Sequence, residues 1–188
     1  MSALQDDNLI KGQSFRTFLA AYTKLKGVGT SDALLPHVPP QLAEAIRYGT
    51  LLASTWHPIA WYRALHQAVE NVHGVNHDFA RQIGREATMQ DMRGVYSFIL
   101  RIVSPARVIT NMDWILGLYI KQFHVTQLVR EPTHVECRLV LPGSSELMWH
   151  ELHAGSDVML NATGAKELKS VLVLENSNTA RWQASWRT

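Results

Sequence analysis

The last third of the chain carries the pattern that most restricts its fold. Residues 124–141 predict a β-hairpin that turns at Pro132, residues 144–163 predict a helix, and residues 169–187 predict a second hairpin. Only helical patterns precede this β-β-α-β-β order. We therefore predict an α+β fold, in which N-terminal helices are followed by β-β-α-β-β and an antiparallel four-stranded sheet packs on a buried central helix.

The strand segments alternate between apolar and polar side chains. In the first hairpin, Val135, Cys137 and Leu139 alternate with polar residues, and the final strand repeats this pattern with Trp182 and Trp186. A period of two indicates one buried face and one solvated face. Cys137 is the only cysteine, so no intrachain disulfide is possible, and its place on the buried face favours a small core residue over a nucleophile.

Two helical segments stand out. Ser104-Pro105 predicts a capped helix start, and the segment that follows, to about Gln122, is the most apolar of the chain. A helix that is apolar almost all round is normally buried, so we expect it to be the central helix. The earlier helix that Asn76 caps carries a ridge of small residues, Ala80, Gly84 and Ala87, which indicates close approach of another backbone, either within the chain or in a second copy.

Length and composition predict one globular domain, residues 1–188, with a helical part to about residue 122 and a sheet-containing part from about residue 123. Only 18% of the residues are charged, the net charge is +2, and no block of Lys and Arg marks a nucleic-acid site. The N-terminus lacks the apolar core of a secretory signal, and no apolar stretch is long enough to span a membrane. We expect a cytosolic protein.

No catalytic signature occurs in the sequence. Gly-x-Ser-x-Gly and Gly-x-x-x-x-Gly-Lys are absent. His150 and His153 share one helix face, and His73 and His77 flank a turn, but neither pair has a third ligand at metal-binding spacing. We therefore predict neither an enzyme nor a metal site, and no cofactor.

Several short stretches carry a resemblance to a known group of proteins. These are Ile10-Lys11-Gly12, Trp56-His57-Pro58-Ile59-Ala60-Trp61-Tyr62, Ile83-Gly84-Arg85, Ser104-Pro105 and Arg181-Trp182-Gln183-Ala184-Ser185-Trp186-Arg187. With them, the order of helices followed by β-β-α-β-β resembles the ligand-binding superfamily of NO-signalling and Golgi-transport proteins. That superfamily includes haem-NO-binding, TRAPP-type and vinyl-reductase-type domains. More closely, the chain resembles an uncharacterised myxobacterial family of similar length.

The resemblance implies an α+β domain with an apolar pocket, which accepts haem, an acyl chain or a small effector in relatives, and a homodimer formed through helices. Haem-NO-binding domains use an axial histidine and a Tyr-x-Ser-x-Arg contact to the propionates. Tyr96-Ser97 lacks the arginine at the required offset, and the motif is absent from the chain. The sequence therefore disfavours haem.

These observations favour a non-enzymatic, cytosolic sensing or adaptor domain that binds a small hydrophobic ligand and signals through a protein partner. From their positions, we expect Phe98, Ile115, Tyr119 and Trp149 to line the pocket. The alternative is a ligand-free homodimeric scaffold with Ala80, Gly84 and Ala87 at its interface. A haem-based gas sensor is the third hypothesis.

Overall fold

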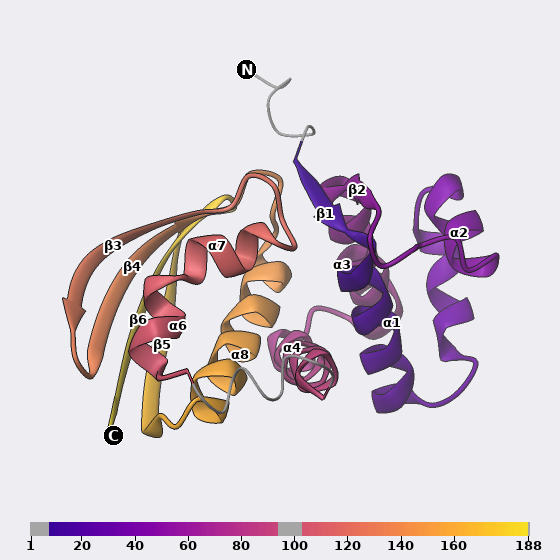
Figure 1. Cartoon of the computed structure of the whole chain (residues 1–188). Coiled ribbons are helices and arrows are strands. Elements are labelled where there is room, and N and C mark those ends of the chain that lie inside the picture. The colour runs from indigo at the N-terminus through magenta and orange to yellow at the C-terminus, as the bar shows by residue number, and fades with distance from the viewer. Residues whose placement is uncertain (1–7, 94–102, 188) are drawn as a thin grey trace.

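The computed structural model describes residues 8–93 and 103–187. The helical first half comprises β1 (Leu9–Lys11), α1 (Gly12–Lys26), the 3-10 helix η1 (Thr30–His37), α2 (Pro40–Arg47), β2 (Trp56–Pro58), α3 (Ile59–His73) and α4 (His77–Met92). The second half comprises α6 (Pro105–Thr110), α7 (Met112–Gly117), β3 (His124–Glu131), β4 (His134–Val140), α8 (Glu146–Ala162), β5 (Lys166–Asn176) and β6 (Thr179–Arg187). The sheet lies at one side of the molecule and α1–α3 lie at the other, with α4 and α8 between them (Figure 1).

The four-stranded sheet has the order β3-β4-β6-β5, and every neighbouring pair is antiparallel. Across the central pair, Cys137 lies opposite Trp182, and both are buried. The two hairpins and the helix between them confirm the predicted β-β-α-β-β order. The sheet also buries the predicted face, because alternate residues of β4 and β6 point to the same side.

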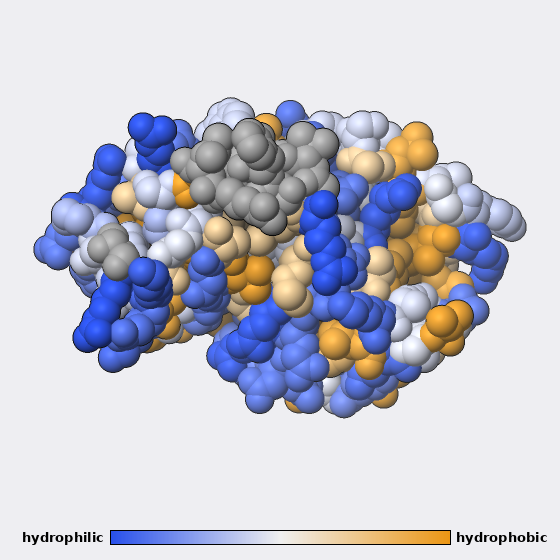
Figure 2. All heavy atoms as spheres, turned by 60° about the horizontal axis from the view of Figure 1, so that its bottom comes forward, coloured by the Kyte–Doolittle hydropathy of each residue, from blue (hydrophilic) through white to orange (hydrophobic). Residues whose placement is uncertain are grey.

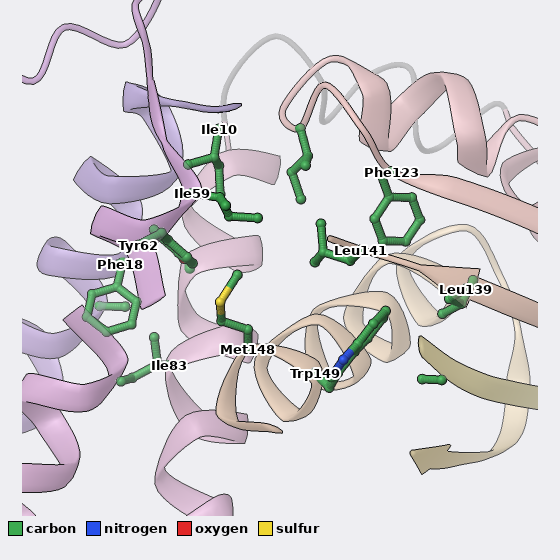
Figure 3. Packing of buried hydrophobic residues seen from close by; sticks show 14 of the residues in the cluster. Ile10, Phe18, Ile59, Tyr62, Ile83, Phe123, Leu139, Leu141, Met148 and Trp149 are labelled. Carbon is green, nitrogen blue, oxygen red and sulfur yellow. The ribbon is translucent and has the colours of Figure 1, made fainter. Parts of the chain in front are cut away.

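The helix α8 is the buried element between the sheet and α4 (Figure 1). Its residues Met148 and Trp149 leave the helix on different sides (Figure 3): Met148 lies toward Tyr62, and Trp149 lies toward Phe123. The Trp149 indole Nε1 donates a hydrogen bond of 2.9 Å to the Ser177 carbonyl in the β5–β6 turn. This bond and the fully buried ring attach α8 to the sheet.

The apolar segment after Ser104 differs from its prediction. Ser104 caps a helix as expected, with its side chain accepting a hydrogen bond from the Arg107 backbone N–H. The helix ends at Thr110, where Asn111 is the C-cap with φ −105° and ψ 13° and its side chain donates 2.8 Å to the Arg107 carbonyl, and α7 begins at Met112. The long central helix predicted to Gln122 was therefore wrong: the segment forms α6 and α7, and Trp114 is 66% exposed.

A short sheet that the sequence did not reveal joins distant parts of the chain. The strands β1 and β2 pair antiparallel, with Ile10 opposite His57. Beyond α7, Ile120 forms an antiparallel bridge with Ile10, and the Lys11 backbone N–H donates 2.8 Å to the Tyr119 carbonyl. The end of α7 is therefore tied to the first strand of the helical half.

Three further observations complete the architecture. The helical pattern predicted between Gly94 and Val103 lies almost wholly outside the described residues.

Within residues 8–93 and 103–187, none of the helices combines the length and the apolar character that a membrane crossing requires. On the face shown in Figure 2, hydrophobic residues reach the surface in small groups among hydrophilic ones.

Candidate functional site

A cavity of about 370 Å³ lies between α4, α6, α7 and α8. Most of its lining is apolar and includes Val108, Ile115, Leu116, Leu141, Met148 and Met159. The volume falls within the range of about 300–1,000 Å³ that is typical of small-molecule sites. A cavity with this lining has little to offer water and suits an apolar ligand.

The cavity has a polar side built around Glu151 of α8. The Tyr62 hydroxyl donates 2.6 Å to Glu151 Oε1, and His66 Nε2 lies 2.7 Å from Oε2. Tyr62 and Glu151 line the cavity, whereas His66 is buried behind them. Burial and the adjacent Glu151 carboxylate raise the pKa of Tyr62 well above its ordinary value. Tyr62 therefore remains a protonated donor at neutral pH.

A second carboxyl group, Asp91, lines the same cavity from the last turn of α4. Its Oδ1 accepts a hydrogen bond of 2.8 Å from Gln13 Nε2 on α1. Burial raises the pKa of Asp91, and the hydrogen bond from Gln13 opposes this shift. Asp91 and Glu151 together supply acceptor oxygens to a cavity that is otherwise mostly apolar.

The four residues predicted to line the pocket divide into three groups. Ile115 and Tyr119 line the cavity. Trp149 is buried but belongs to the contact between α8 and the sheet, because its indole bonds to the β5–β6 turn. Phe98 lies outside the described residues.

The ridge of Ala80, Gly84 and Ala87 lies inside the chain. A Cβ atom added at Gly84 would collide with the backbone carbonyl of Glu151, so α4 and α8 touch at this point. Ala80 and Ala87 are also buried. The predicted close approach thus occurs within one chain, and α8 occupies the place that a partner helix would take in the predicted interface. A homodimer stays a prediction.

Sequence reasoning missed the residues that give the cavity its polar side. Tyr62 lies among buried residues of α3, beside Ile59 and Leu65, so a polar atom on an apolar helix face was the available signal. Glu151 follows the buried run Leu147–Trp149 in the same way. Their pairing was not visible in the sequence, because they are far apart in the chain and belong to different helices.

Two of the histidines noted in the sequence have structural partners. His73 Nε2 lies 2.8 Å from the Tyr22 hydroxyl, and His153 Nε2 lies 2.7 Å from Ser170 Oγ. The first contact joins α3 to α1, and the second joins α8 to β5. Neither histidine reaches the cavity lining.

Comparison with known proteins identifies the fold. The chain is similar to the Fe(II) unliganded H-NOX protein from K. algicida, with a TM-score of 0.73, 11% identity, and coverage of 95% of this chain and 97% of that one. It is also similar to an H-NOX protein from S. oneidensis in the Fe(II)NO ligation state (TM-score 0.69, 10% identity, coverage 95% and 100%). A third similar structure is an oxygen-binding H-NOX domain related to soluble guanylate cyclases (TM-score 0.66, 13% identity, coverage 95% and 96%).

These similarities establish an H-NOX-like fold. They establish the fold alone, because the sequence identities are too low to show a shared function. No family model matches the chain, and no curated protein matches it. The haem-NO-binding branch of the predicted superfamily is thus supported at the level of the fold. The TRAPP-type, vinyl-reductase-type and myxobacterial resemblances stay predictions.

Haem has to be considered as a ligand of this cavity, because one of the similar structures concerns haem distortion in the H-NOX family. Haem iron in proteins is held by His, Cys or Tyr, or by Met together with His. All nine histidines and Cys137 lie in the described part of the chain, and none of them lines the cavity. Tyr62 donates its hydroxyl to Glu151. The residues of this cavity therefore do not fit a haem whose iron is held by histidine or cysteine.

Proposed function

We propose that this chain is a haem-free, non-enzymatic sensing domain that binds a small amphiphilic molecule in the cavity between α4, α6, α7 and α8. The observation that carries this proposal is the apolar cavity of about 370 Å³ with Tyr62, Asp91 and Glu151 on its polar side. An H-NOX-like fold without a histidine or cysteine in the cavity lining supports a ligand other than haem.

The polar side suggests the chemistry of the ligand. Glu151 already accepts one hydrogen bond at each oxygen, but each carboxylate oxygen has two acceptor sites. Asp91 Oδ1 accepts from Gln13, which leaves further acceptor capacity on its carboxyl group. Arg107 adds one positive charge to the lining, against the two carboxyl groups of Asp91 and Glu151. A ligand with an apolar body and a donor head group, such as a protonated amine, therefore complements the Asp91 and Glu151 side of this cavity.

The α6–α7 wall gives the bound molecule a route to the rest of the fold. The backbone N–H of Val125 in β3 donates 3.0 Å to Asp113 Oδ1 of α7, and the Lys11 backbone N–H donates to the carbonyl of Tyr119. A ligand that favours one position of α7 therefore changes both the sheet edge and β1. Signalling then follows from a shift between two populated arrangements, by as much as the ligand's affinities for them differ.

Isothermal titration calorimetry with decylamine and decanoate tests this proposal. The two probes share an apolar chain and carry opposite charges, so we expect decylamine to bind with at least about tenfold higher affinity. Ile115→Trp fills the cavity and is expected to abolish decylamine binding, whereas the matched control Val171→Trp, at a position 55% exposed on β5, leaves it unchanged. Equal binding of both probes, or binding that survives Ile115→Trp, would contradict the proposal.

The alternative, a ligand-free homodimeric scaffold, predicts a different outcome. Such a protein binds neither probe, and its sedimentation velocity is that of a dimer whether or not Ile115 is replaced. The two hypotheses are thus separated by one set of proteins and two measurements.

A further inference from the structure

Three potential metal ligands meet where α4 and α8 begin. His77 is the first residue of α4, Glu146 is the first residue of α8, and His150 lies one turn further along α8. Glu146 Oε1 is 3.2 Å from His77 Nε2 and 3.8 Å from His150 Nε2. The two imidazole rings stack, with their centroids 4.3 Å apart and their planes at 26°.

These separations suit a single metal ion. The three ligand atoms all lie within 4.8 Å of one another. Zinc bonds of about 2.0–2.2 Å in a tetrahedral site place neighbouring ligand atoms about 3.3–3.6 Å apart. The separations of 3.2 Å and 3.8 Å from Glu146 Oε1 to the two histidines are close to that spacing.

The exposure of the three side chains leaves an entry path and an open coordination position. The Glu146 side chain is 57% exposed and the His77 side chain is 41% exposed, whereas the His150 side chain is 13% exposed. A site with three protein ligands and a water in the fourth position is a common zinc arrangement, and two His with one Glu is among its known ligand sets.

Hydrogen bonding within the protein does not account for His150. Its Nδ1 is buried and has no hydrogen-bond partner within the part of the chain that the structure describes. Its Nε2 lies too far from Glu146 for a good hydrogen bond, at 3.8 Å. The His150 ring, which stacks on His77 and approaches Glu146 only to 3.8 Å, therefore has a ring nitrogen available for a metal ion.

One nearby cation opposes metal binding. Arg81, one turn along α4 from His77, lowers the pKa of His150, after the larger effects of burial and of His77 itself. Arg81 forms an ion pair of 3.0 Å with Asp78, which offsets part of its charge. The Glu146 carboxylate supplies the negative charge within the cluster.

We infer that His77, Glu146 and His150 form a binding site for a divalent transition-metal ion of the zinc type, which joins the beginnings of α4 and α8. The site is separate from the cavity and does not depend on the function proposed for it. The sequence did not reveal this site. His150 and His153 are neighbours on α8 and were interpreted together, whereas His77, which lies beside His150 in the structure, belongs to α4.

Metal titrations of the full chain, after treatment with EDTA, test the site. We expect one Zn²⁺ per chain by calorimetry, and affinity at least about tenfold lower in His77→Ala and in His150→Ala. The control His124→Ala removes an exposed histidine of β3 and is expected to bind zinc as the unaltered chain does. Circular dichroism checks that each variant is folded.

A spectroscopic measurement reports the ligands themselves. With Cu²⁺ in place of Zn²⁺, electron paramagnetic resonance is expected to show coupling to two imidazole nitrogens in the unaltered chain and in His124→Ala, and to one in His77→Ala. Absence of stoichiometric metal binding, or identical spectra and affinities in all variants, would overturn the inference.

Discussion

The wall of the cavity that α4 and α8 form and the wall that α6 and α7 form are built differently. The first consists of helices of 16 and 17 residues that touch backbone to backbone at Gly84. The second consists of two helices of 6 residues each, and the Trp114 side chain of α7 is 66% exposed to solvent. Helices this short have little stability of their own and depend on the contacts they make.

This difference assigns separate tasks to the two walls. The α4–α8 wall carries the polar cluster, since Glu151 and Asp91 belong to it, and its close packing holds those groups in place. The α6–α7 wall supplies Ile115, is followed by Tyr119, and is attached to the sheet by single hydrogen bonds, such as the 3.2 Å bond from Gln127 Nε2 to the Ile109 carbonyl. In the proposed function, the first wall recognises the head group of the ligand and the second wall adjusts to its apolar body.

Substitution of one glycine in each wall gives the largest contrast. Gly84→Leu places a side chain against the Glu151 backbone carbonyl, which cannot move without displacing α8, so we expect a loss of about 3 kcal/mol or more in the free energy of unfolding. Gly117→Ala adds a methyl group at the end of α7 into open space and is expected to stabilise the chain by up to about 1 kcal/mol. Urea denaturation measures both. Similar effects at the two sites would show that the walls are equally tolerant.

Removal of one hydroxyl group tests the polar cluster of the α4–α8 wall. In Tyr62→Phe the Glu151 carboxylate loses its 2.6 Å donor in a buried setting, and we expect a loss of about 1–3 kcal/mol. Tyr48, which is 72% exposed, provides the matched control, since Tyr48→Phe is expected to change stability by less than about 0.5 kcal/mol. If the two variants unfold at the same urea concentration, the cluster does not stabilise the wall.

The smallest expected effect concerns Asp91 and depends on pH. Because burial raises the pKa of Asp91 in the folded chain, the unfolded chain ionises first as the pH rises, and the folded state loses stability from the ordinary carboxyl range up to the folded pKa. Above that pH the deficit is constant. Asp91→Asn keeps an oxygen for Gln13 and removes the charge, so its melting temperature should exceed that of the unaltered chain at pH 7 and equal it at pH 3.

Asp32→Asn, at an exposed position, serves as the control for the loss of one negative charge. An Asp91→Asn variant that is less stable at both pH values would show that the carboxylate stabilises the α4 end of the cavity. In that case Asp91 would not be an acceptor retained there for a ligand.

The sequence predicted what depends on local pattern. Alternation placed Cys137 and Trp182 on the buried sheet face, and the caps Asn76 and Ser104 begin helices where expected. The positions of Ile115 and Tyr119 in an apolar segment also led to the prediction that they line the pocket, and both line the cavity. Each of these inferences uses residues close together in the chain.

What the sequence could not predict depends on which elements meet. An apolar segment was expected to be one buried helix, but Asn111 divides it and one side faces a cavity. Tyr62 and Glu151 are 89 positions apart, and their contact follows only from the packing of α3 against α8. Periodicity tells which face of a helix is buried, but it does not tell what that face contacts.

Native mass spectrometry of the chain purified from its own source tests the central claim most directly. The account predicts a complex heavier than the polypeptide by one small amine-bearing molecule, lost on denaturation and absent from Ile115→Trp, with no Soret absorption. A complex with the mass of haem and a Soret band, or a bare polypeptide mass in both proteins, would contradict it.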